Sequence, residues 1–132
     1  MGRIAHRFCF ASVAAAGVLA FGVAVLADAS SETVTATTHA ELAAGASDLS
    51  GVHSHLHHAL NCLVGPGGNG FDAKEMNPCA QSGKGAIPDT TDASKKAALE
   101  TAAEKVRSGL MASDLKASRN DASAAASMLK GK

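Results

Sequence analysis

The sequence predicts an all-α protein, a small three-helix bundle with a long Gly/Pro-rich loop that a disulfide staples down. Three observations lead to this fold class: leucines recur at helical spacing, glycine and proline gather in one central segment, and no segment is typical of a strand. Only 46% of the 132 residues are hydrophobic, and many of these lie in the first 27 residues. The core must therefore be small, which excludes a doubly wound sheet or a barrel enzyme.

The first 29 residues are predicted to be a signal peptide that is cleaved on export. Arg3 and Arg7 precede an uncharged run over 8–27. Small residues stand at the −3 and −1 positions for cleavage after Ala27, and Ala29 is a second candidate. The alternative is an uncleaved membrane anchor, because 20 apolar residues can just span a bilayer. In either case we expect the rest of the chain to be exported, to the periplasm or outside the cell.

The cysteine count predicts one disulfide in the exported chain. Cys62 and Cys79 are the two cysteines that remain after the signal peptide, and in an oxidising compartment two cysteines most simply pair with each other. The bond would close a loop over 63–78 and contribute about 3 kcal/mol to stability. The alternative is that the two thiolates are metal ligands.

The residues after the signal peptide divide into a leader and a helical domain. Segment 30–38 is polar and rich in Ser and Thr, so we expect a flexible polar leader. A small helical domain is expected over 39–132. Its first helix is predicted over 39–64, because leucine recurs there every seven residues and so lies on one side of a helix. These leucines are Leu42, Leu49, Leu56 and Leu63.

The central segment, 65–90, is predicted to be a loop. The run Gly-Pro-Gly-Gly-Asn-Gly at 65–70 ends the first helix. A loop of about 25 residues is unusual in a small domain. The predicted disulfide makes this length plausible, because it ties the middle of the loop back to the end of the first helix.

Two further helices are predicted over about 92–112 and 114–130. Each follows residues whose side chains can cap a helix N-terminus. Each also carries an apolar stripe, although in the last helix this stripe is mostly alanine, which buries little area. These two segments complete the predicted three-helix bundle.

Histidines in the first predicted helix are the candidate metal ligands. Four of them, His53, His55, His57 and His58, lie within six residues. On an ideal helix His53 and His57 are spaced i,i+4 and border the leucine stripe, whereas His55 and His58 are spaced i,i+3 and share the opposite face. Either pair can chelate a Cu, Ni or Zn ion, because imidazole suits these metals. We expect the outer pair, His55 and His58, to hold readily exchanged metal with solvent completing its coordination. The inner pair, His53 and His57, is the better candidate for a site shared with another helix or with the loop, unless its role is only structural.

Two other interpretations of the histidines remain open. They can line a polar edge of the bundle with a purely structural role, or they can act as a pH sensor that gains charge near pH 6. Catalysis is not expected, because no nucleophile, metalloprotease or phosphate-binding motif occurs. The formal net charge of zero gives no reason to expect nucleic acid as a partner. No membrane association is expected after signal cleavage.

The histidine helix at 52–58, together with an export signal and a small bundle, resembles the small His-rich metal-binding proteins of the bacterial periplasm. Those proteins spread histidine along several helices, whereas this chain confines the cluster to one. The resemblance implies an exported protein that binds or buffers a divalent transition metal. The second hypothesis is a non-catalytic structural or interaction module, in which the same helix docks a protein of the cell envelope.

Overall fold

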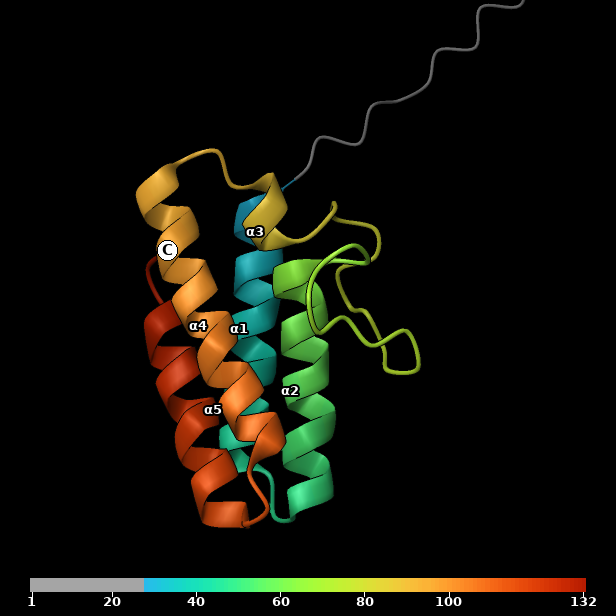
Figure 1. Ribbon diagram of the computed structural model, residues 1–132, viewed down its shortest axis with the longest axis vertical. Helices are drawn as coiled ribbons and strands as arrows, with labels where there is room; N and C mark the ends of the chain where they lie inside the picture. Colours follow the sequence, from blue (N-terminus) through green and yellow to red (C-terminus); the bar gives the residue numbers. More distant parts are fainter. Residues whose placement is uncertain (1–27) are drawn as a thin grey trace, which may run out of the picture.

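Four helices of 15 to 19 residues and one short helix make up the described part of the chain, residues 28–132, in a computed structural model (Figure 1). The helices are α1 (Ala29–Gly45), α2 (Leu49–Val64), α3 (Ala86–Asp89), α4 (Ala93–Met111) and α5 (Leu115–Leu129). No strand occurs within residues 28–132, so the predicted all-α class is confirmed there. The predicted signal peptide falls almost entirely on residues 1–27, outside the described part.

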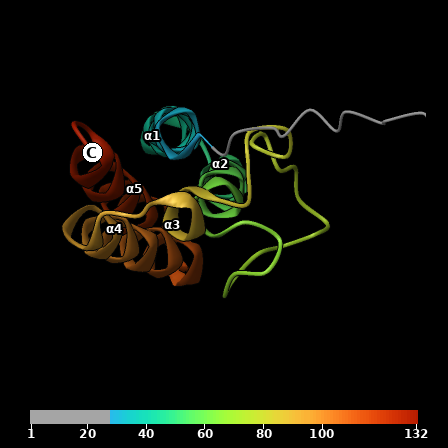
Figure 2. The same ribbon diagram turned by 90° about the horizontal axis from the view of Figure 1, so that it is seen from above.

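The long helices form a ring in which each packs on two neighbours. α1 lies between α2 and α5, and α4 closes the other side between the same two helices (Figure 2). α3 contacts α1, α2 and α4. The bundle therefore has four long helices, and the predicted number of three was wrong. Within residues 28–132, no helix combines the length and the apolar character that crossing a bilayer requires.

The fourth helix comes from the segment predicted to be a flexible leader. Residues 30–38 belong to α1, whose N-terminus is capped by the Asp28 carboxylate. The threonine hydroxyls do not disrupt the helix, because they donate to backbone carbonyls one turn earlier, as Thr33 does to Ala29 (2.6 Å) and Thr37 does to Thr33 (2.8 Å). The prediction of a leader was wrong because a Ser/Thr-rich composition says little about a helix whose alanine face is buried by neighbouring helices.

The helix predicted over 39–64 is two helices joined by a tight turn. α1 ends at Gly45, and α2 begins after Asp48, whose Oδ1 accepts the N–H of Gly51 at 2.8 Å. The turn folds α2 back beside α1 (Figure 1). Leu42 consequently lies on α1 and is 47% exposed, whereas Leu56 of the same seven-residue repeat is fully buried. The repeat therefore does not mark one continuous buried stripe.

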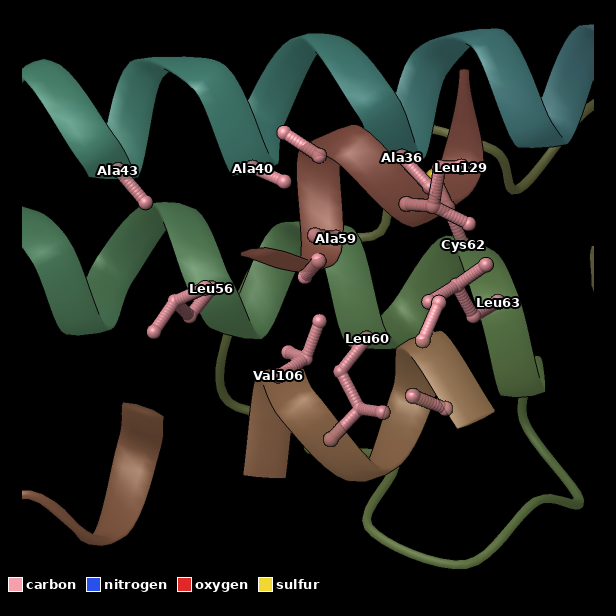
Figure 3. Packing of buried hydrophobic residues seen from close by; sticks show 14 of the residues in the cluster. Ala36, Ala40, Ala43, Leu56, Ala59, Leu60, Cys62, Leu63, Val106 and Leu129 are labelled. Carbon is pink, nitrogen blue, oxygen red and sulfur yellow. The ribbon is translucent and has the colours of Figure 1, made fainter. Parts of the chain in front are cut away.

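The core lies between the four long helices and combines leucines of α2 with alanines of α1 (Figure 3). α4 contributes Val106 and α5 contributes Leu129, both almost fully buried. A Cβ at Gly109 would meet Leu56 Cδ1 at 2.7 Å, so a larger residue there would require the Leu56 side chain to move. The core residues of these two helices that Figure 3 labels include Ala36, Ala40 and Ala43 of α1 and Leu56, Ala59 and Leu63 of α2.

The segment between α2 and α4 is fastened to the end of α2 at two adjacent residues. The predicted disulfide is confirmed, since Cys62 is bonded to Cys79; the alternative that both thiolates bind a metal has no support in this structure. Asn61 is fully buried and supports the loop backbone. Its Nδ2 donates to the carbonyls of Asp72 (2.9 Å) and Met76 (3.1 Å), and its Oδ1 accepts the N–H of Asp72 at 2.9 Å. The predicted loop over 65–90 is thus anchored, and α3 interrupts it.

Candidate metal centre

Three histidines from two helices meet beside the core: His39 of α1 and His55 and His58 of α2. One ring nitrogen of each lies within 4.8 Å of the other two. The Nδ1 atoms of His39 and His55 are 3.3 Å apart. A tetrahedral ion bound at about 2.0–2.1 Å by two imidazoles also places their nitrogens about 3.3 Å apart. The His39–His55 contact therefore already has the spacing of two ligands on one ion.

The rings of the three histidines lie close to one another. The ring centroids of His39 and His58 are 5.0 Å apart and those of His55 and His58 are 5.8 Å apart, both in edge-on arrangements. His58 is buried, with 9% of its surface exposed, while His39 and His55 are partly exposed. This differs from the prediction that the His55/His58 pair faces solvent. That prediction was wrong because α1 folds back over this face of α2.

His39 is the ligand candidate that the sequence analysis did not select. On one continuous helix His39 would lie near His57, at the edge of the leucine stripe. The turn before α2 instead places His39 on a separate helix, opposite His55. The signal that could have revealed this is Gly45 followed by Asp48, a combination typical of one helix ending and another beginning.

The other predicted pair, His53 and His57, is not part of the cluster. His53 Nε2 lies 3.2 Å from the carbonyl oxygen of Ala112, at the turn between α4 and α5. His57 Nδ1 lies 4.0 Å from an oxygen of Asp72 in the loop. His53 therefore has a backbone acceptor of its own. His57 Nδ1 is buried without a hydrogen-bond partner, because 4.0 Å is too long for a hydrogen bond to Asp72. The structural interpretation thus fits His53, and neither residue belongs to the group of three histidines that could hold a metal.

Burial favours the neutral form of His39 and His58. Desolvation lowers the pKa of His39 below its ordinary value of 6.5, and the neighbouring His58 and His55 lower it further. Desolvation also lowers the pKa of His58, although the nearby Glu75 carboxylate acts in the opposite direction. Neutral imidazole is the form that binds metal ions, so the lowered pKa values of His39 and His58 favour the form that metal binding would require.

The anchored loop brings two carboxylates to the histidines of α2. Glu75 Oε2 lies 3.6 Å from His58 Nε2, and Asp72 lies beside His57 as described above. The other ring nitrogen of His58, Nδ1, is buried and has no hydrogen-bond partner. A buried nitrogen without a partner is costly and rare. A bound ion would give that nitrogen a partner.

Solvent can approach the cluster from the turn between α1 and α2. A hollow of about 530 Å³ lies there, and its lining includes His55, Glu41 and Asp48. A second hollow, of about 820 Å³, lies between the loop and α4 and is lined by Ile87, Arg107 and neighbouring residues, but by none of the three clustered histidines. The first hollow therefore reaches a histidine of the cluster, whereas the second does not.

Comparisons with models of protein families, with curated proteins and with solved structures found no match. The function must therefore be inferred from the geometry of His39, His55 and His58.

Proposed function

We propose that this protein binds a divalent transition-metal ion through His39, His55 and His58 and serves as an exported metal-binding or metal-buffering protein. The observation that carries the proposal is the convergence of three ring nitrogens, from two helices, within 4.8 Å of one another. Three neutral imidazoles and one water make a tetrahedral zinc site with an open position, and imidazole also suits Cu(II) and Ni(II). The partly exposed rings of His39 and His55 can turn to bring all three nitrogens to bonding distance.

The open side of the cluster suits an ion that enters and leaves. The hollow beside His55 is bordered by the carboxylates of Glu41 and Asp48. Glu41 is paired with Lys130 at 2.8 Å, so Asp48 is the carboxylate that can attract a cation toward the opening. An exchangeable ion fits a buffering role. We propose binding without catalysis, because the chain carries none of the catalytic sequence patterns considered above.

Export is the second part of the proposal. It is supported by the predicted signal peptide and by the Cys62–Cys79 disulfide, which suits an oxidising compartment such as the periplasm. The interaction-module hypothesis has less support, because His58 is turned into the bundle and is not available to an envelope protein.

Calorimetric titration of the mature protein with Zn(II), Cu(II) and Ni(II) at pH 7.5 tests the proposal. We expect stoichiometric binding that is lost when His39, His55 and His58 are all replaced by alanine. The matched control is the variant with His53→Ala and His57→Ala, which removes two histidines from the same helix and is expected to bind like wild type. Wild-type binding no tighter than millimolar, or equal loss in the control, would overturn the proposal.

A further inference from the structure

We propose that Glu75 is a positioning residue for the metal site. Its carboxylate accepts the Nε2–H of His58 and so leaves Nδ1 of His58 free for the ion. This inference rests on the proposed function of the histidine cluster. It starts from two facts about one ring: Nε2 of His58 faces the Glu75 carboxylate at 3.6 Å, and Nδ1 is buried without a hydrogen-bond partner.

The chemistry of neutral imidazole links these two facts. A neutral ring carries its proton on one nitrogen, and only the other nitrogen has a lone pair for a metal. A carboxylate is an acceptor, so Glu75 favours the form of His58 that is protonated at Nε2. Metal-bound histidines commonly donate their second nitrogen to a carboxylate in this way, which fixes the ring and raises its basicity.

The position of Glu75 fits a residue that orients His58 better than it fits a metal ligand. Among residues 28–132, the group of side chains whose ligand atoms all lie within 4.8 Å of one another contains the three histidines and no carboxylate. A distance of 3.6 Å is longer than a formed hydrogen bond, so the contact must shorten when the ion binds. The Glu75 side chain is 36% exposed and has the freedom to do this.

The backbone of Glu75 is held where this role requires. Asn61 Nδ2 donates to the carbonyls on both sides of Glu75 in the loop, at Asp72 and Met76. Cys62, the next residue of α2, is bonded to Cys79 three residues beyond Met76. α1, α2 and the anchored loop would then each supply a part of one site, with the loop supplying the residue that orients His58.

Zinc titration of the full mature chain provides the first test. We expect Glu75→Ala to weaken Zn(II) binding by about 10- to 100-fold, and Glu75→Gln to recover most of the affinity because its amide oxygen can accept the same hydrogen bond. Asp72→Asn is the matched control: it removes the charge of a loop carboxylate that faces His57, keeps an oxygen that can accept the N–H of Lys74, and is expected to leave zinc affinity unchanged. Unchanged affinity in Glu75→Ala, or an equal loss in Asp72→Asn, would overturn the assignment.

Nitrogen NMR of the His58 ring in the metal-free protein provides a second test that does not depend on metal binding. We expect the Nε2–H form in wild type and in Glu75→Gln, and a mixture of the two forms in Glu75→Ala. A wild-type ring protonated at Nδ1 would refute the role of Glu75. Absence of zinc binding in wild type, with the expected ring protonation, would instead refute the proposed function and leave the contact with Glu75 in place.

Discussion

The two histidine pairs of α2 have similar helical spacing but different surroundings. His55 and His58 lie under α1, where His39 joins them. His53 and His57 lie against the α4–α5 turn and the loop, where a backbone carbonyl and a carboxylate are their neighbours. Spacing along one helix therefore shows which histidines can act together. The element that packs against them decides whether they form a metal site or a structural contact.

Removing the disulfide is expected to have the largest effect on the surroundings of both histidine pairs, because the loop supplies a neighbouring carboxylate to each pair. Cys79→Ser should lower stability by about 3 kcal/mol and the melting temperature by roughly 15 °C. Thermal unfolding monitored by circular dichroism measures this. Zinc affinity should fall as well, because Glu75 is no longer held beside His58. A melting temperature that Cys79→Ser leaves unchanged would contradict the prediction. Alkylation of wild type should find neither Cys62 nor Cys79 as a free thiol.

Asn61 allows the loop to be released without touching the cysteines. Asn61→Ala removes the side chain that satisfies several loop backbone groups, so we expect a loss of about 2–3 kcal/mol in urea unfolding. Asn61→Asp retains the acceptor for the Asp72 N–H but places a carboxylate oxygen against the loop carbonyls at a fully buried site, so we expect a loss at least as large as that of the alanine variant. Equal stability of wild type and Asn61→Ala would show that the disulfide alone anchors the loop.

The turn between α1 and α2 can be weakened to test what brings His39 to the other two histidines. Asp48→Ala removes the N-terminal cap of α2 and should cost about 1 kcal/mol in urea unfolding. Asp48→Ser is the control, since a serine hydroxyl can cap the same N–H and should retain most of the stability. If the alanine and serine variants lose the same amount, the cap is not the source of the effect.

A smaller and gradual change in stability is expected from pH, through His39 and His58 of the histidine cluster. The pKa values of His39 and His58 in the folded protein are lowered below 6.5. As the pH falls below about 6.5 the unfolded chain therefore takes up protons first, and stability decreases until the folded-state pKa values are passed. Urea unfolding between pH 7.5 and 5 measures this slope.

Replacing His39 and His58 by glutamine should reduce the slope of stability against pH. The control variant, with His53→Gln, should keep it. A wild-type slope in the glutamine variant would place the responsible groups elsewhere in the chain.

Local features of the sequence account for much of the helical architecture. The Gly/Pro run after α2 ends that helix, and capping residues precede α4 and α5, because these effects depend on backbone geometry within a few residues. The pairing of Cys62 with Cys79 could be predicted because these are the two cysteines that follow the predicted signal peptide. The proximity of His55 and His58 followed from their i,i+3 spacing, which any regular helix produces.

Tertiary packing decided the parts that local patterns could not predict. The helix from Ala29 to Gly45 depends on burying an alanine face that has little drive to fold alone, so its composition resembled that of a leader. The contacts of His39 with His55, and of Glu75 with His58, join residues far apart in the chain. These contacts exist because a three-residue turn folds α1 onto α2 and because Asn61 and the disulfide hold the loop, so their physical origin is packing and not periodicity.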